Sequence, residues 1–299
     1  MNEAIVEQLL ATRNADGGWG SGPDRPSATE QTALACMAMR SAGLPAESDE
    51  AASWLVTQQR EDGAWPIEAA VPGPSWSTSL AVLALLDGGA DPAARRGVEW
   101  LLEERGIGIP LRVRISEFFR EKKTTALDPT LRGWPWATGT FSWIEPTAWA
   151  ILAILRAWPA GPPGNARDRV EEGRRMIIDR TCPGGGWNYG NKKVLGVDME
   201  PYPDSTAVAL LALGALRDDS DEVETSFDAL ERMLEVTHSG LTLSLSILCY
   251  REWGRDATEL AALLEDAFAR TGFLGDVRSL SLATLALADS PVTLLVNGR

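Results

Sequence analysis

Trp54-Leu55-Val56-Thr57-Gln58-Gln59-Arg60-Glu61-Asp62-Gly63-Ala64-Trp65 is the clearest copy of a pattern that recurs along this chain. Its closing Gly and Trp return in three other stretches: Asp16-Gly17-Gly18-Trp19, Gly133-Trp134-Pro135-Trp136 and Gly184-Gly185-Gly186-Trp187. After each copy comes a polar or Pro-containing loop, and then a Thr that opens a run rich in Ala and Leu: Thr32, Thr78, Thr147 and Thr206. Self-similarity of this kind is the sequence signature of a repeat architecture.

The spacing of apolar residues predicts two kinds of helix in six successive units. Amphipathic outer helices are expected at residues 2–13, 48–60, 93–105, 166–180, 221–236 and 256–270. More uniformly apolar inner helices are expected at residues 30–43, 77–88, 146–157, 205–217, 239–252 and 277–288. A helix that is apolar on all sides, such as Leu80–Leu86, has to be covered on every side. Six helical hairpins that close into a ring meet this need without exposed ends.

The fold class that follows is all-α: an (α/α)6 toroid of six helical hairpins, with inner helices around a central apolar cavity. No strand-like alternation competes with this interpretation, and no linker separates two cores. We therefore expect residues 1–299 to form a single domain, although this length would also suffice for two. A long insertion, 106–133, interrupts the third unit.

Charge and cysteine content narrow the class of protein. The chain has 42 acidic and 28 basic residues, and its formal net charge of −14 predicts no nucleic-acid partner, because such a surface repels phosphate backbones. The N-terminus carries no basic and apolar signal segment, and no apolar run reaches the roughly 18 residues that span a bilayer. With three scattered cysteines, a reduced cytoplasmic protein is expected, and peripheral contact with a membrane stays open.

The stretch Trp54–Trp65 resembles the QW motif of the prenyltransferase and squalene-cyclase repeat superfamily. Glu145-Pro146-Thr147-Ala148-Trp149-Ala150 and Gly186-Trp187-Asn188-Tyr189-Gly190 are also similar to this superfamily, and the resemblance covers nearly the whole chain. It implies an α/α toroid whose apolar cavity holds an isoprenoid. The motif also makes physical sense alone, because an Asp-Gly turn tolerates positive φ and the Trp can pack over a Gln amide and helix ends. Most Trp residues are accordingly expected to be structural.

Carboxylates occupy an equivalent position in several units. Two residues before the Thr that opens each inner helix stand Glu30, Trp76, Glu145 and Asp204. At a helix N-terminus a carboxylate can accept hydrogen bonds from backbone N–H groups and interact favourably with the helix dipole. In the alternative interpretation these groups face the cavity, where one of them donates a proton. The sequence leaves both interpretations open.

The segment Tyr202-Pro203-Asp204-Ser205-Thr206-Ala207 looks like the DxDDTA segment of acid-initiated, class II terpene cyclases, with Tyr202 and Ser205 in place of the flanking Asp residues. The resemblance implies that Asp204 is the proton donor, and Glu145 is the second candidate at the equivalent repeat position. Such chemistry needs an acid in a dry pocket and aromatic faces that stabilise a carbocation. The candidate substrate-binding residues are Trp76, Trp143, Trp149, Trp187, Tyr189 and Tyr202.

The insertion is basic within an acidic protein. From residue 105 to residue 132, three acidic residues are outnumbered by seven basic ones: Arg105, Arg112, Arg114, Arg120, Lys122, Lys123 and Arg132. Interleaved apolar residues make the segment a candidate contact for an anionic membrane or a substrate diphosphate. A solvated flap over the ring is the alternative.

Metal-dependent chemistry has little support in the sequence. No ligand spacing for zinc joins the residues that would have to supply it: Cys36, Cys182, Cys249 and His238. No cofactor is therefore expected, although a diphosphate-bearing substrate would call for Mg²⁺.

The leading hypothesis for function is a class II terpene cyclase-like enzyme, an isomerase or lyase that protonates and cyclises an isoprenoid in the toroid. One alternative is a non-catalytic protein that binds an isoprenoid or lipid. Another is a carbohydrate-active toroid enzyme in which Glu145 and Asp204 form a carboxylate pair. The sequence predicts neither the oligomeric state nor the length of the isoprenoid chain.

Overall fold

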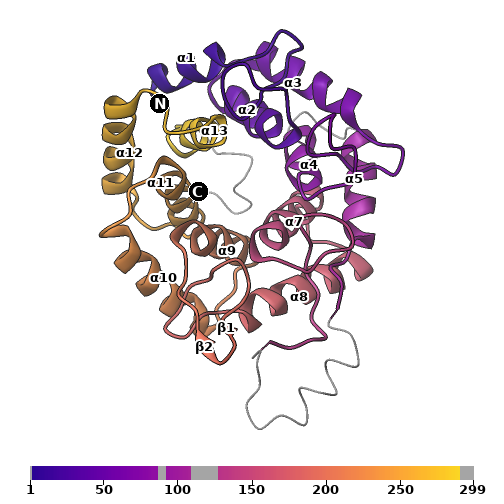
Figure 1. Cartoon of the computed structure of the whole chain (residues 1–299), viewed down its shortest axis with the longest axis vertical. Helices are drawn as coiled ribbons and strands as arrows, with labels where there is room; N and C mark the ends of the chain where they lie inside the picture. The colour runs from indigo at the N-terminus through magenta and orange to yellow at the C-terminus, as the bar shows by residue number, and fades with distance from the viewer. Residues whose placement is uncertain (1, 87–91, 109–126, 290–299) are drawn as a thin grey trace.

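The computed structural model describes residues 2–86, 92–108 and 127–289, and these contain twelve α-helices that alternate between an outer and an inner ring (Figure 1). The outer helices are α1 (Glu3–Ala11), α3 (Pro45–Gln58), α5 (Pro92–Glu103), α8 (Gly164–Asp179), α10 (Asp221–Leu234) and α12 (Thr258–Thr271). The inner helices are α2 (Thr29–Ser41), α4 (Thr78–Leu86), α7 (Ile144–Ala157), α9 (Pro203–Leu216), α11 (Gly240–Glu252) and α13 (Val277–Ala286). Each lies within a few residues of its expected range.

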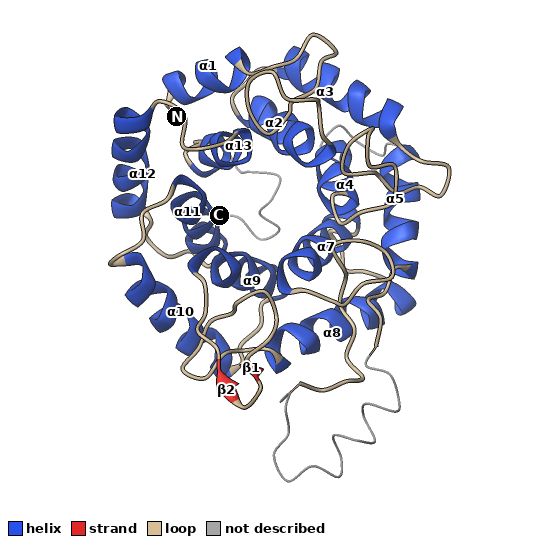
Figure 2. Cartoon of the chain, in the orientation of Figure 1, coloured by secondary structure: helices blue, strands red, loops and turns tan. Residues whose placement is uncertain are grey.

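The inner helices close into a ring. Each packs against the next in the order α2, α4, α7, α9, α11 and α13, and α13 packs back against α2. Helix α1 packs on the outside of α13, so the first and the last of the described helices lie side by side (Figure 2). The predicted all-α toroid is therefore confirmed.

The tight hairpins join each inner helix to the outer helix that follows it. Three residues, 42–44, connect α2 to α3, and the two helices pack closely; α7 with α8 and α9 with α10 are paired in the same way. The Gly-Trp loops make the longer connection from an outer helix to the next inner helix. The only strands in the described ranges, which the sequence did not predict, are β1 (Lys193–Val194) and β2 (Val197–Asp198), an antiparallel pair within one such loop.

The inner helices form the core because they are apolar on all sides. Leu80–Leu85 and Ala207–Leu213 are at most 2% exposed. Burial of an aliphatic side chain stabilises the folded state by about 1.5–3 kcal/mol, so this layer supplies most of the hydrophobic stabilisation. Among the described residues, no helix combines the length and the apolarity that a bilayer crossing requires.

Four buried Trp residues fasten the outer helices to the inner ones. The indole Nε1–H of Trp19, Trp65, Trp134 and Trp187 donates to a carbonyl in the last turn of an outer helix: Leu9 (2.9 Å), Leu55 (2.7 Å), Leu101 (2.8 Å) and Ile177 (2.7 Å). Carbonyls in the last turn lack the regular partner four residues further along the helix, although those of Leu9 and Ile177 also accept from the backbone N–H groups of the C-cap residues Thr12 and Arg180. The backbone N–H of the same four residues donates to a Thr Oγ1 of the next inner helix: Thr32, Thr78, Thr147 and Thr206. The expected structural role of Trp is confirmed at these positions.

The quoted motif also joins one unit to the next. The Gln59 side-chain amide donates to the carbonyls of Gly63 and Ala93, each at 2.8 Å, and Ala93 belongs to α5 of the following unit. Gly63 has φ of +89°, and a Cβ there would lie 2.6 Å from the Arg96 carbonyl oxygen. Only glycine combines this backbone conformation with such a close approach of α5.

Most of the basic insertion, residues 109–126, lies outside the described residues, so its predicted contacts are not described. The base of the insertion is held by the buried Arg169. Its guanidinium lies 3.4 Å from the centre of the Trp134 ring and donates to the Arg132 carbonyl at 2.9 Å. Both the cation–π contact and the hydrogen bond stabilise the junction between the insertion and the ring.

Substitution of Thr78 by Val tests the Trp–Thr connection. Val keeps the volume but removes the acceptor of the buried Trp65 N–H, so we expect a loss of about 1–3 kcal/mol in the free energy of unfolding. Urea denaturation measures this loss. Thr57→Val, at an exposed position on α3, is the matched control and should change stability by less than about 0.5 kcal/mol. An equal effect of the two substitutions would contradict the proposed role of the Thr hydroxyl.

Candidate functional site

Charged residues stand at the second position of four inner helices: Glu30 of α2, Glu145 of α7, Asp204 of α9 and Arg278 of α13. Outer and inner helices alternate along the chain and around the ring, so all the inner helices begin at the same end. We call this end the N-terminal face. The repeat therefore places these side chains in one layer.

Arg278 connects two of the carboxylates. Its Nε lies 3.1 Å from Glu30 Oε1, and its Nη2 forms an ion pair with Glu145 Oε1. Helix α2 is a neighbour of α13 in the ring, whereas α7 is not, so the second ion pair reaches past the ring's nearest-neighbour contacts. We call these three residues the Arg278 cluster. Their side chains are only 12–19% exposed.

The environment of Glu30 favours its neutral form. Burial is the main cause, and the nearby carboxylates of Glu145 and Asp276 add to it, so the pKa of Glu30 is raised to about 7 in spite of the opposing effect of Arg278. Burial alone would lower the pKa of Arg278, but Glu145 and Glu30 raise it, so its guanidinium stays charged. A cation between two carboxylates is balanced by one of them, and the second can keep its proton near neutral pH.

The clustered carboxylates do not act as helix caps. Neither Glu30 nor Glu145 accepts a hydrogen bond from a backbone N–H among the described residues, and the N-cap residues Ala28 and Trp143 provide no side-chain cap. Both carboxylates are instead directed to Arg278. Capping, one of the two interpretations that the sequence left open, is therefore not what Glu30 and Glu145 do in this structure.

Trp149 contacts the cluster from within α7. This residue is almost fully buried, and its Nε1–H lies 3.3 Å from Glu145 Oε1, one helical turn away. The indole therefore helps to orient the carboxylate. Of the aromatic residues expected at the site, Trp149 is the one with a hydrogen bond to a candidate catalytic group.

Asp204 stands apart from this cluster. Its side chain is partly buried, and no hydrogen bond or ion pair joins its carboxylate to any of the described residues. Near it in sequence, Tyr202 pairs with Tyr189 at 5.1 Å between ring centres, and both rings are partly exposed. The structure thus brings Glu145 together with Glu30, and it leaves Asp204 beside the tyrosine pair.

The remaining expected aromatic residues differ in their position. Trp187 is fully buried between α8 and α9, where both of its N–H groups are used to connect the helices, so it presents no surface to a ligand. Trp76 packs edge to face on Trp136, with 4.8 Å between ring centres. Trp143 is partly buried at the N-cap of α7.

Glu30 and Arg278 were not among the predicted site residues. Glu30 was visible at the repeat position that precedes Thr32, but the cyclase resemblance favoured Asp204 and Glu145. Arg278 stands at the second position of the last expected inner helix, where the residue is basic instead of acidic. A comparison of this one position in all six units would have found both residues.

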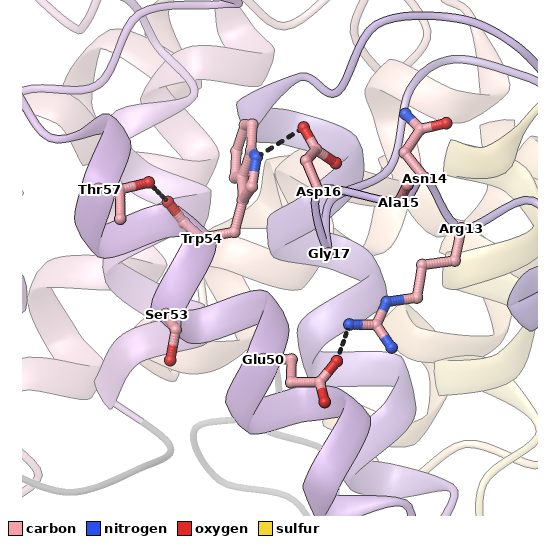
Figure 3. Close-up of a pocket in the computed structure, with 9 residues that line it drawn as sticks. All are labelled: Arg13, Asn14, Ala15, Asp16, Gly17, Glu50, Ser53, Trp54 and Thr57. Carbon is pink, nitrogen blue, oxygen red and sulfur yellow. Dashed lines mark hydrogen bonds and ion pairs between the residues drawn. The ribbon is translucent and has the colours of Figure 1, made fainter.

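A hollow lies on the outside of the ring, between the first Gly-Trp loop and α3 (Figure 3). It has a volume of about 760 Å³. Its polar groups already join the first two units: Trp54 Nε1–H donates to Asp16 at 3.0 Å, and Arg13 forms an ion pair with Glu50. Burial alone would raise the pKa of Asp16, but hydrogen bonds from Ser27, Gly18 and Trp54 keep it below its usual value. We therefore assign this groove to the contact between units.

The cysteines and the histidine have structural surroundings. Cys36, Cys182 and Cys249 are buried and form no disulfide, and His238 Nε2 lies 2.8 Å from the Leu234 carbonyl at the end of α10. Within the described ranges, no three His, Cys, Asp or Glu side chains converge in a way that would hold a metal ion.

No protein-family model matches this chain, and no curated protein matches it in sequence. Among solved structures, it is similar to the type II terpene cyclase MstE from Scytonema, in an Asp-to-Asn variant bound to its substrate geranylgeranyl dihydroxybenzoate. The identity is 16% and the TM-score 0.54, over 90% of this chain and 76% of MstE.

Carbohydrate-active enzymes are equally similar. An α-amylase from Clostridium perfringens is 11% identical with a TM-score of 0.62, over 94% of this chain and 95% of the other. A family 8 endoglucanase from Klebsiella pneumoniae is 13% identical with a TM-score of 0.59, over 95% and 97% of the two chains. At these identities the similarity shows the fold alone, which is shared by enzymes with different chemistry.

The pH dependence of stability tests the environment of Glu30. The pKa is about 7 in the folded protein and near the ordinary 4.5 in an unfolded chain. Below pH 4.5 both states hold the proton; between pH 4.5 and 7 only the unfolded state releases it. The free energy of unfolding should then fall by up to about 1.4 kcal/mol per pH unit. Urea denaturation between pH 4 and 8 should therefore show that the free energy of unfolding of Glu30→Gln rises relative to that of the wild type as the pH increases.

Glu61→Gln, at an exposed position, is the matched control for the loss of one carboxyl group. A difference between wild type and Glu30→Gln that stays constant from pH 4 to 8 would contradict the buried, neutral state of Glu30.

Proposed function

We propose that the protein is an acid-initiated isoprenoid cyclase that works at the N-terminal face of the toroid. The observation that carries this proposal is the layer of acidic groups, Glu30, Glu145 and Asp204, at the start of inner helices that are otherwise apolar. Acids above an apolar wall suit a hydrocarbon substrate that has to be protonated and then kept from water.

The proposed reaction begins when a carboxylic acid protonates a terminal C=C bond of the isoprenoid. The π electrons form the new C–H bond and leave a carbocation, which a second C=C bond attacks to close a ring. Loss of a proton to a carboxylate ends the sequence, so that an isomer of the substrate results. Asp204 is the proposed donor, because it matches the middle Asp of the DxDDTA segment and stands at the start of an inner helix. Glu145, which is ion-paired to Arg278, becomes the less suitable donor.

Aromatic faces stabilise the cation in this proposal. Tyr202, which precedes Asp204 by two residues, and its partner Tyr189 offer partly exposed rings, and the quadrupole of each ring attracts a positive charge. The reaction needs no cofactor; Mg²⁺ would enter only if the substrate carries a diphosphate.

Mass spectrometry of protein incubated with isoprenoids tests the cyclase. The panel contains squalene, farnesyl diphosphate and geranylgeranyl diphosphate, the last two with and without Mg²⁺. We expect a cyclised product that Asp204→Asn reduces at least about a hundredfold, because general acid catalysis contributes on this scale. Asp219→Asn, at an exposed position, is the matched control and should keep full activity.

Two other results would change the assignment. A product that survives Asp204→Asn but is lost in Glu145→Gln would move the donor to α7. An intact isoprenoid that stays bound to the protein without conversion would identify a carrier instead of an enzyme.

Glycoside hydrolysis is the second candidate, and the Arg278 cluster favours it. The carboxylates of Glu30 and Glu145 both contact the guanidinium of Arg278. The raised pKa of Glu30 suits a general acid at neutral pH. The similarity in fold and length to an α-amylase and an endoglucanase supports this alternative.

An assay of reducing ends released from α-1,4- and β-1,4-glucans separates the two candidates. Hydrolysis that Glu30→Gln lowers at least about a hundredfold, while Asp204→Asn leaves it intact, would establish the glycosidase and refute the cyclase. If neither glucan is cut, the glycosidase is rejected for these substrates.

A further inference from the structure

The loop between α8 and α9 carries the β1–β2 hairpin on a well-ordered stem. The buried Asn188 side chain accepts hydrogen bonds from the backbone N–H groups of Gly190 and Asn191, and it donates to the carbonyls of Asn191 and Glu200. The two strands add an antiparallel pair above this stem. The hydrogen bonds of the stem therefore hold the hairpin in one conformation.

The tip of this hairpin is apolar and exposed. Leu195 is 82% exposed, Val197 65% and Val194 41%. Single exposed aliphatic residues are common on protein surfaces, but three within four residues on a projecting turn form a small apolar surface. We call these three residues the hairpin tip.

Turn geometry does not explain the leucine. Leu195 has φ of +51° and Gly196 φ of +83°, so both central residues of the turn are left-handed. Asn, Asp and Gly are the residues that such two-residue turns favour, because a larger L side chain is strained at positive φ. Leu195 is thus unfavourable both for the backbone and for contact with water.

We propose that the hairpin tip inserts into the surface of a lipid bilayer. The groups are arranged in the order that a bilayer presents: aliphatic side chains at the end of the loop, and behind them, at its base, the partly exposed rings of Tyr189 and Tyr202. Tyrosine prefers the interface between hydrocarbon and headgroups, since one end of its side chain is apolar and the other polar.

The charges near the tip are balanced by near neighbours. Lys193 lies 2.8 Å from Asp198, and Lys192 lies 3.8 Å from Asp179. The remainder of the protein is strongly acidic. Attraction to anionic lipid therefore adds little, and burial of apolar surface is the main driving force for binding.

The same loop lies at the N-terminal face. The backbone carbonyl of Tyr189 accepts a hydrogen bond, at 3.0 Å, from the backbone N–H of Ile144, the first residue of α7. The loop ends where α9 begins. A bilayer at the hairpin tip would lie on the side of the ring that holds Asp204 and the Arg278 cluster. The further idea that an isoprenoid enters from that bilayer rests on the proposed function, but bilayer binding does not.

Sedimentation of the full chain with phosphatidylcholine vesicles tests the inference. We expect the wild type to pellet with the vesicles equally in 0.1 M and 0.5 M NaCl, and Leu195→Asn to bind at least about tenfold more weakly. Asparagine is well suited to the left-handed turn position, so this variant should keep or raise the thermal stability of the protein. Val197→Thr should weaken binding in the same direction, and Val56→Thr, an exposed valine on the outer helix α3, is the matched control.

Three results would overturn the inference. One is an absence of wild-type binding to phosphatidylcholine vesicles. Another is binding that Leu195→Asn and Val197→Thr leave unchanged. A third is binding that needs phosphatidylglycerol and disappears in 0.5 M NaCl, which would point to basic residues instead of the hairpin tip. The vesicle experiment contains no isoprenoid, so its outcome is independent of the cyclase assay.

Discussion

The double hydrogen bond of each buried Trp is the interaction on which the rest of the ring depends. An indole N–H satisfies an orphan carbonyl at the end of an outer helix, and the backbone N–H of the same residue reaches a Thr hydroxyl at the start of the next inner helix. One residue thereby sets both the distance and the relative height of two helices. Because the connection is repeated in four units, the starts of the corresponding inner helices share one level.

The closed ring brings charged residues from three helix starts together. Glu30, Glu145 and Arg278 stand at equivalent places on α2, α7 and α13, and only a closed ring brings them within the reach of one guanidinium. Burial is the main cause that raises the pKa of Glu30 to about 7, and the nearby carboxylates of Glu145 and Asp276 add to it.

The two candidate reactions use different parts of this face. Cyclisation of an isoprenoid would draw on Asp204 and the tyrosine pair, whereas glycoside hydrolysis would draw on the Glu30–Glu145 pair. Proteins of similar fold include enzymes named for both kinds of chemistry. Function in such folds is decided by the residues of the site and not by the fold.

The sequence by itself determined the all-α repeat, the approximate bounds of all twelve helices and the structural role of the repeated Trp, because Gly-Trp loops and apolar periodicity are local signals. It also placed Glu145 and Asp204 at helix starts. Only the tertiary structure decided that Glu145 and Glu30 both contact Arg278, that Asp204 is not part of this cluster, and that Trp187 packs between α8 and α9. Glu145 and Arg278 are 133 residues apart in the chain, and their encounter follows from ring closure, which sums small rotations over six units and leaves no mark at either residue.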